Sequence, residues 1–126
     1  MHLIGKIDKK IYECIAGDIL TKEVIITDER IRHIKVRHPN DYERYCGCLK
    51  EIVEMPDYIV ETNKPKTALI LKKFVESDVS YFKTVLRLAT LSDAPKLKNS
   101  VITFMKINKK EWKRMIRNKK ILYKKE

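Results

Sequence analysis

The stretch RHIKVRHP, residues 32–39, holds two histidines, His33 and His38, within a run of cations. Imidazole titrates near neutral pH, so it can pass a proton to or from a reacting group, and its neutral form can bind a metal ion. Three uses are open for this pair: a metal site, an acid–base centre beside a bound phosphate, or two ordinary histidines on a basic surface helix.

The spacing of the two histidines disfavours a shared metal ion. Two histidines that chelate one ion from a helix are four residues apart, as in HExxH, and lie on one face. His33 and His38 are five apart, or about 140° around a helix of 3.6 residues per turn. Cys46 and Cys48 are two apart and also fall on different faces. With no CxxC pair and no close group of carboxylates, we expect no metal and no cofactor.

The helical pattern of residues 28–38 gives the two histidines different surroundings. Arg30, His33 and Arg37 share one face, so cations that can bind a phosphate flank His33. His38 falls on the face that carries the isoleucines, which favours a hydrogen-bonded histidine at the edge of the core. From the residues alone, a surface histidine on a basic helix is an equal alternative for His33.

One candidate strand carries cations among apolar residues. In YFKTVLRLAT, residues 81–90, a period of two places Lys83 and Arg87 on one face and the large apolar residues on the other. A cation within an apolar strand is costly to bury alone. Arg87 is therefore expected either to pair with a carboxylate or to receive an anionic ligand.

Two other candidate strands add cations and hydroxyls. In KTALILKK, Lys66 and Lys72 fall on one face and Thr67 on the other. In NSVITF, Ser100 and Thr103 fall on opposite faces by the same period. Taken singly, each of these hydroxyls is more often an ordinary strand residue than a functional one.

Periodicity and turn residues predict the elements that position these side chains. Residues 2–7 and 11–15 predict a short hairpin around DKK. Further strands are predicted where β-branched or aromatic runs are bounded by turn formers: residues 23–27, 57–62, 66–74, 81–90, 99–107 and, at an edge, 121–125. Helices are predicted after residues that can cap them: 28–38 after Thr27, 41–55 after Asn40 and 109–118 after Asn108.

This order of elements predicts an α+β fold. N-terminal helices pack on an antiparallel sheet of about four strands, and a basic C-terminal helix follows. The length of 126 residues fits a single domain, 1–126, with residues 1–23 as a small N-terminal hairpin extension.

The charge is concentrated near the end of the chain. Residues 106–126 hold ten Lys or Arg and two Glu, and so carry +8 of the net charge of +11. Such a segment attracts polyanions such as nucleic acid, although a solvated surface helix has the same composition.

The opening MHLIGKIDKK lacks the apolar core of a signal peptide, and no run of about 18 apolar residues exists. We therefore expect a cytoplasmic protein with no membrane partner and no disulfides among its three cysteines.

Six short blocks, in order, resemble the phage-type nuclease families of the Barnase–EndoU–colicin–RelE-like (BECR) superfamily: ITDERIRHIKVRHPNDYERY, PDYIV, KTALILKK, VLRLAT, NSVITF and ILYKK. The likeness runs from about Val24 to Lys124. It implies N-terminal helices against a four-stranded antiparallel sheet, and metal-independent RNA cleavage in a toxin or phage-borne effector. It also implies an RNA substrate, such as a tRNA or an mRNA, and an antitoxin or immunity protein as a partner.

The resemblance places the family's functional positions on particular residues of this chain. The histidine of the helix block falls on His33, with His38 beside it. The other positions fall on Thr67, Lys72, Arg87, Ser100, Thr103 and Tyr123. The likeness leaves open which of them do chemistry.

RNA can be cut without a metal because its 2′-OH is an internal nucleophile, which a base activates while an acid protonates the leaving oxygen. Our hypothesis assigns the catalytic roles as follows: His33 as base or acid, Arg87 and Lys72 as a phosphate clamp, Ser100 or Thr103 as a donor to a phosphate oxygen, and Tyr123 as a stacking surface or second proton carrier. The residues expected to bind the nucleic acid are Arg30, Arg37, His38, Lys66, Thr67, Lys110, Lys113, Arg114 and Arg117.

Three other functions fit the same residues. A non-catalytic nucleic-acid-binding module would use the cations without an acid–base pair. A ribosome-dependent toxin of the RelE kind would need the ribosome to complete its site. A protein-interaction or phage-assembly domain would use the charge for solubility alone.

Overall fold

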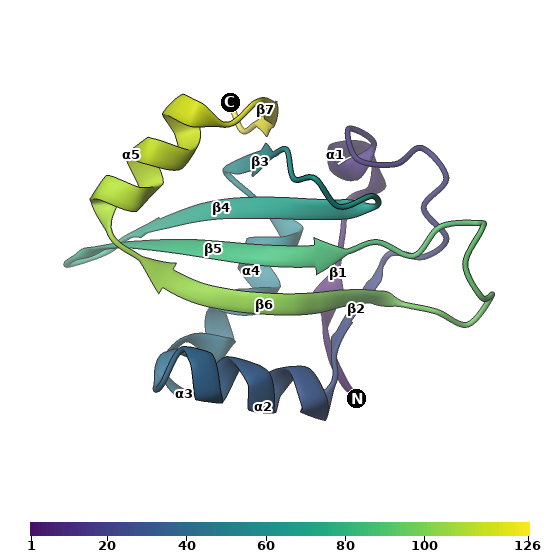
Figure 1. Cartoon of the computed structure of the whole chain (residues 1–126), viewed down its shortest axis with the longest axis horizontal. Helices are drawn as coiled ribbons and strands as arrows, with labels where there is room; N and C mark the ends of the chain where they lie inside the picture. Colours follow the sequence, from purple (N-terminus) through teal and green to yellow (C-terminus); the bar gives the residue numbers. More distant parts are fainter.

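Seven strands form one sheet in the computed structural model, which describes all residues from 1 to 126 (Figure 1). In the order in which they lie side by side, the strands are β1 (His2–Lys6), β2 (Glu23–Ile26), β6 (Asn99–Ile107), β5 (Val79–Arg87), β4 (Thr67–Val75), β3 (Tyr58–Val60) and β7 (Ile121–Lys124). All neighbours are antiparallel except β2 and β6, which are parallel. The predicted α+β class is confirmed, whereas the prediction of about four antiparallel strands is wrong in number and in one pairing.

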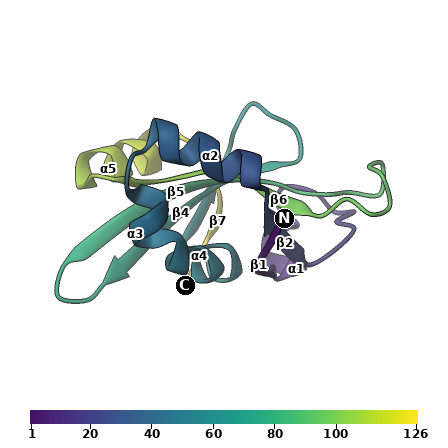
Figure 2. The same ribbon diagram turned by 90° about the horizontal axis from the view of Figure 1, so that it is seen from below.

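Helices cover both faces of this sheet (Figures 1 and 2). They are α1 (Lys9–Tyr12), α2 (Asp28–Arg37), α3 (Asp41–Tyr45), α4 (Leu49–Glu54) and α5 (Lys109–Asn118), with a 3₁₀ turn at Cys46–Cys48. Two predicted caps are confirmed. Thr27 Oγ1 accepts a bond from the Arg30 amide at 3.2 Å, and Asn108 Oδ1 accepts one from the Glu111 amide at 2.8 Å.

The predicted N-terminal hairpin is wrong. β1 pairs with β2, and residues 9–12 form α1 instead of a returning strand. The Asp8 carboxylate accepts a bond from the Lys10 amide at 2.9 Å and so starts a helical turn. Tyr12, at the end of that turn, is fully buried, and its hydroxyl donates to the Val53 carbonyl at 2.7 Å. Residues 1–23 are therefore part of the sheet and of the core.

The predicted helix of residues 41–55 is broken in the middle. α3 ends at Tyr45, a 3₁₀ turn containing Gly47 follows, and α4 begins at Leu49. Glycine is a poor helix former, which agrees with a break at this point. Asn40 has a left-handed backbone, with φ of 73°, and its side chain makes no cap hydrogen bond. α3 is instead held by Asp41, whose carboxylate accepts a bond from the Lys106 amide of β6 at 3.1 Å.

The two faces of the sheet carry different layers. On the face toward α1 and α4, called here the back face, β4, β5 and β6 contribute Ile70, Phe82, Leu86 and Phe104 to the main core. On the opposite, front face, α5 packs its Trp112 and Met115 against Val60, Leu69 and Leu71. α2 lies alongside β6 and reaches the same side as α5 (Figure 2). Between α2 and α5 the front face is free of helices.

None of the helices is both long and apolar enough to cross a lipid bilayer.

Candidate functional site

Two adjoining hollows on the front face share Arg30, Lys64 and Ile102, and together they are called here the α2 groove. Its walls and floor come from α2 and the residue after it, from the loop between β3 and β4, and from the front face of β4, β5 and β6. The lining residues are Arg30, His33, Arg37, His38, Lys64, Pro65, Thr67, Val85, Arg87, Ile102, Thr103 and Met105. The loop that contains Lys64 rises on the same side of the sheet as α2 and α5 (Figure 2).

The α2 wall presents cations and imidazoles. Arg30, His33 and Arg37 all line the half of the groove beside β6, as their shared helical face predicted. His38 lies there too, which corrects the prediction of separate surroundings for the two histidines. α2 ends at Arg37, and His38 has φ of −131° and ψ of 73° before Pro39. Because His38 is outside the helix, the 140° separation expected on a continuous helix does not apply to it.

A β-bulge in β6 brings two hydroxyls to the front face. Ser100 pairs with Arg87, and Thr103 pairs with Val85. One residue lies between the two partners on β5, whereas two residues lie between Ser100 and Thr103 on β6. Ile102 is the extra residue, and its presence breaks the period of two. The prediction that Ser100 and Thr103 lie on opposite faces is therefore wrong. Thr103 lines the hollow that holds both histidines, whereas Ser100 lies outside it.

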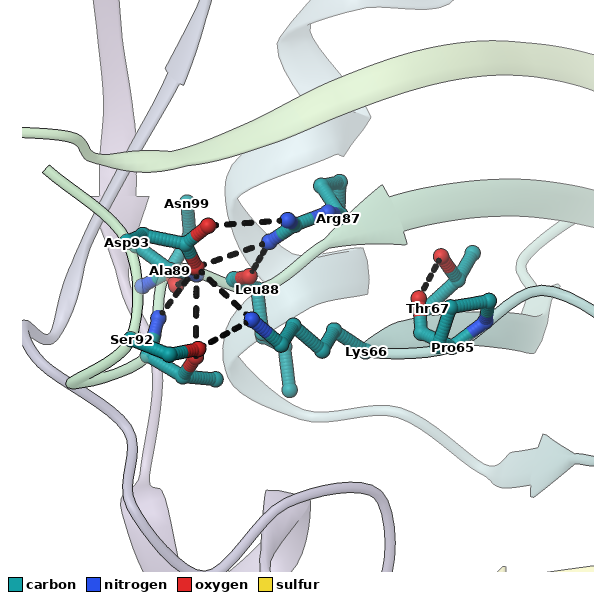
Figure 3. A network of polar contacts seen from close by, with 10 residues as sticks. Pro65, Lys66, Thr67, Arg87, Leu88, Ala89, Ser92, Asp93 and Asn99 are labelled. Atoms are coloured by element: carbon teal, nitrogen blue, oxygen red, sulfur yellow. Dashed lines mark hydrogen bonds and ion pairs between the residues drawn. The ribbon is translucent and has the colours of Figure 1, made fainter.

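Arg87 pairs with the carboxylate of Asp93, which confirms one of its two predicted partners (Figure 3). It also lines the groove, and an anionic ligand for it stays a prediction. Its Nη1 and Nη2 atoms donate to the two Asp93 oxygens at 3.2 and 3.1 Å, and Nη1 also donates to the Leu88 carbonyl. This ion pair and the Thr90 amide hold the pKa of Asp93 far below its usual range. A guanidinium has five N–H donors, so one on Nε and one on Nη2 are left for another partner.

Lys66 and Thr67 are committed to local contacts. Lys66 has a left-handed backbone, with φ of 56°, and its Nζ donates to Ser92 Oγ at 2.5 Å. It also lies 3.5 Å from Asp93, so it joins the Arg87 cluster and does not line the groove (Figure 3). Thr67 lines the groove floor, but it is almost fully buried and its hydroxyl donates to the Pro65 carbonyl at 2.9 Å.

Lys72 does not reach the groove. It lies on the back face of β4, where only 3% of the residue is exposed. Its Nζ donates to the Met55 carbonyl at 2.6 Å and lies 3.5 Å from Asp57 and 3.6 Å from Glu51. The expected clamp of Lys72 with Arg87 is therefore wrong: Arg87 pairs with Thr67 and shares its face, and the period of two within β4 places Lys72 on the face opposite to Thr67.

Tyr123 is also away from the groove. It is the β7 partner of Ile59 and packs against the main core on the back face. It does not line the hollow that holds His33, so it is not placed to serve as the second proton carrier there.

The basic helix α5 lies on the same side of the sheet as the groove (Figure 2). Its exposed cations are Lys109, Lys110, Lys113, Arg114 and Arg117, and all of them except Lys109 were among the residues expected to bind nucleic acid. Arg114 pairs with Glu111 at 2.5 Å, whereas the other four form no ion pair. Trp112 is 8% exposed and packs on Tyr58 and Tyr81. It serves as the anchor of α5.

Two polar residues at this site were not anticipated from the sequence. Lys64 lies in the stretch NKP, which indicates only a turn, and nothing local shows that it reaches over the sheet face. Asp93 lies in the loop after β5, where SDAP also indicates a turn. The prediction that Arg87 either pairs with a carboxylate or receives an anionic ligand was the one signal that could have led to Asp93.

A separate hollow lies near the far end of the β4–β5 hairpin. Aromatic rings of Tyr45, Phe74 and Phe82 line it together with the carboxylates of Glu51, Glu76 and Asp78. Negative charge repels a polyanion, so this hollow does not suit nucleic acid, whereas the cationic α2 groove does. No group of three or more His, Cys, Asp or Glu side chains is arranged to hold a metal ion.

Comparison with known proteins gives one family. The model of the family PBECR2, described as "phage-Barnase-EndoU-ColicinE5/D-RelE like nuclease2", matches residues 1–124. No curated protein and no solved structure matches the chain significantly. The match covers every strand and helix that forms the α2 groove.

Proposed function

The chain belongs to this phage Barnase–EndoU–colicin E5/D–RelE-like nuclease family, and on that premise we propose that it is a metal-independent endoribonuclease that cuts RNA in the α2 groove. In this proposal the 2′-OH of the substrate attacks the adjacent phosphate, and the products are a 2′,3′-cyclic phosphate and a free 5′-OH. The protein would act as a phage-derived or toxin-type effector.

The observation that carries the proposal is the meeting of two imidazoles, one hydroxyl and several cations in one hollow. His33, His38 and Thr103 line it together with Arg30, Arg37 and Lys64. Transphosphorylation needs one proton acceptor and one proton donor on a bound phosphodiester, and imidazoles near neutral pH serve in either role. Cations and hydroxyl donors stabilise the charge that gathers on the phosphorane.

The reaction follows directly from these groups. One imidazole takes the proton of the 2′-OH, and the oxygen forms a bond to phosphorus. The bond from phosphorus to the 5′-oxygen breaks, and the other imidazole gives that oxygen its proton. A base and an acid each contribute about 10²–10⁴-fold when well placed. His33 and His38 form this pair, and the same bonds form and break in the same order whichever of them begins as the base.

The phosphate is bound from two sides in this scheme. Arg87 offers its free Nε and Nη2 donors from the floor, in the fork geometry that matches two phosphate oxygens. Lys64 and Arg30 approach from the walls, because both line each of the adjoining hollows. Thr103 donates its hydroxyl to a non-bridging oxygen. The cations of α5 add a sequence-independent attraction for the RNA backbone.

The groove favours a reaction without a metal because of the kind of side chains that it offers. The hollow around His33 is lined by arginines, a lysine and imidazoles, with no carboxylate among its residues. Magnesium prefers carboxylate and other oxygen ligands, and cations repel it. The internal 2′-OH nucleophile also makes activation of water unnecessary.

The test is cleavage of an end-labelled RNA in EDTA, with analysis of the product ends. We expect cyclic-phosphate ends from the wild type, and loss of about 10²-fold or more of the rate in each of H33A and H38A. A matched RNA with 2′-deoxyribose at the cleaved position is the substrate control and should stay intact. Cleavage of the deoxy substrate, or full activity of both histidine variants, would refute the mechanism.

Two outcomes point to the rival functions. RNA binding without cleavage, with steep salt dependence, would support a non-catalytic binding module. Cleavage only in the presence of translating ribosomes would support a ribosome-dependent toxin of the RelE kind.

A further inference from the structure

Asp93 is the most heavily bonded carboxylate beside the α2 groove. Its two oxygens accept from Arg87 Nη1 and Nη2, from the Thr90 amide at 2.8 Å and from the Thr90 hydroxyl at 3.2 Å. Lys66 Nζ lies 3.5 Å from the same carboxylate (Figure 3). One side chain thus joins β5, the start of β4 and the loop after β5.

The loop fixes Asp93 independently of Arg87. The Asp93 amide donates to the Thr90 carbonyl at 2.9 Å, so residues 90–93 form a tight turn. The preceding Ala89 amide donates to the side chain of Asn99 at 2.8 Å, and Asn99 is fully buried. Asn99 in turn donates to the carbonyls of Thr21 and Glu23, which ties the turn to β2. The carboxylate is therefore held in place by the fold itself.

The direction from which Asp93 meets Arg87 decides what the guanidinium can still do. Asp93 takes the end of the group, because its oxygens face Nη1 and Nη2, and the Leu88 carbonyl takes the remaining donor of Nη1. The two donors left, on Nε and Nη2, lie next to each other along the side of the group. Such an edge binds two oxygens of one phosphate. About a third of the Arg87 side chain is exposed, and it lines the groove.

Charge distinguishes this arrangement from a carboxylate that merely occupies the place of the phosphate. Arg87 and Lys66 both form ion pairs with Asp93, so the three side chains together carry a net charge of +1. A phosphate that approaches the side of the guanidinium still meets a positive centre. It does not need to displace Asp93, because the carboxylate lies on the other edge.

We propose that Asp93 is a positioning residue, which holds Arg87 by its end so that the side of the guanidinium faces a phosphodiester in the α2 groove. This inference rests on the proposed function of the groove. It makes Asp93, which touches no substrate, the residue that sets the orientation of the phosphate clamp.

The first test is steady-state cleavage by D93N, which keeps an oxygen for the Thr90 amide but loses the charge and one acceptor. We expect kcat to fall about 10- to 100-fold, as for a misplaced catalytic group, with KM changed far less. R87A should lose at least as much, and the double variant D93N/R87A should lose no more than R87A alone. The control is E23Q, which removes the carboxylate of another ion pair, to Lys98 at 2.6 Å, outside the groove. Additive losses in the double variant would overturn the proposal.

The second test does not depend on cleavage. The Nε–H signal of Arg87 is followed by nitrogen-edited NMR during titration with a short RNA whose 2′-hydroxyls are methylated and cannot react. We expect the signal to shift on addition of this RNA to the wild type, and the shift to be lost in D93N while E23Q behaves as the wild type. A wild type that shows this shift but cuts no RNA would uphold the positioning role and refute the nuclease. An equal shift in the wild type and D93N would overturn the positioning role.

Discussion

Replacing Lys72 by methionine should weaken the fold by about 1–2 kcal/mol and leave RNA cleavage unchanged. Lys72 lies on the back face of the sheet, away from the α2 groove, with its Nζ bonded to the Met55 carbonyl at 2.6 Å. Methionine has a similar length and fills a similar space, but it loses the cation–π contact of Nζ with the Phe74 ring, whose centroid lies 5.7 Å away. The variant therefore tests the assignment of the two faces.

The expected loss of stability follows from the groups that lose the Lys72 ammonium as their partner. A fully buried carbonyl without a partner costs about 1–3 kcal/mol, and the Met55 carbonyl should cost less, because Met55 is 50% exposed and its bond with Lys72 is only partly buried. Breaking a fully buried ion pair costs about 3–5 kcal/mol, but the Glu51 side chain is 54% exposed and regains water. Asp57 keeps its bond from the Lys73 amide at 2.8 Å. Loss of the desolvation cost of Lys72 offsets part of the remainder.

The assay combines thermal unfolding with initial cleavage rates at 20 °C. A loss of 1–2 kcal/mol should lower Tm by about 3–10 °C in a chain of this size. K73M, which changes the exposed neighbour on the same strand, is the matched control and should alter neither quantity. If K72M lost cleavage with its fold intact while K73M did not, Lys72 would act in catalysis and the reasoning from the two faces would fail.

The remaining predictions concern the groove. K64Q should reduce the salt dependence of RNA binding by about 0.7 in the slope of log K against log salt, the value for one phosphate of a single strand, as measured by fluorescence titration. T103V should lower kcat about 10-fold with little change in KM, whereas S100A should leave both nearly unchanged; equal effects would contradict the register of β6. The pKa of Asp93 is lower in the folded than in the unfolded chain. Its charge therefore stabilises the fold fully above the unfolded pKa and progressively less as the pH falls through the folded one. The stability difference between wild type and D93N, measured by urea unfolding, should thus be constant between pH 6 and 8 and shrink below about pH 4.

Local patterns predicted well where one element alone decides the outcome. The face shared by Arg30, His33 and Arg37 follows from helical period, and α2 is one uninterrupted helix over these residues. The cost of burying a cation predicted either a carboxylate partner or an anionic ligand for Arg87, and Asp93 is that carboxylate partner. These are properties of short segments, which a single sequence contains.

Features that depend on distant pairing could not be read in the same way. The parallel contact of β2 with β6 joins residues about 75 positions apart, and no local signal encodes it. The bulge at Ile102 reversed the expected face of Thr103, because a period of two assumes a regular strand. Lys72 and Arg87 lie on adjacent strands, and only the register between the strands shows that they face opposite ways.

The bulge in β6 also has a consequence for insertions and deletions. Loss of one residue from a strand usually turns every following side chain to the wrong face, which places polar groups in the core. In β6 the extra residue Ile102 lies between Val101 and Phe104, both of which face the core. Deleting Ile102 would restore simple alternation, with Thr103 still on the front face and Phe104 still buried. This strand can therefore lose one residue and keep its pairing, and the change would act on the curvature of the groove floor.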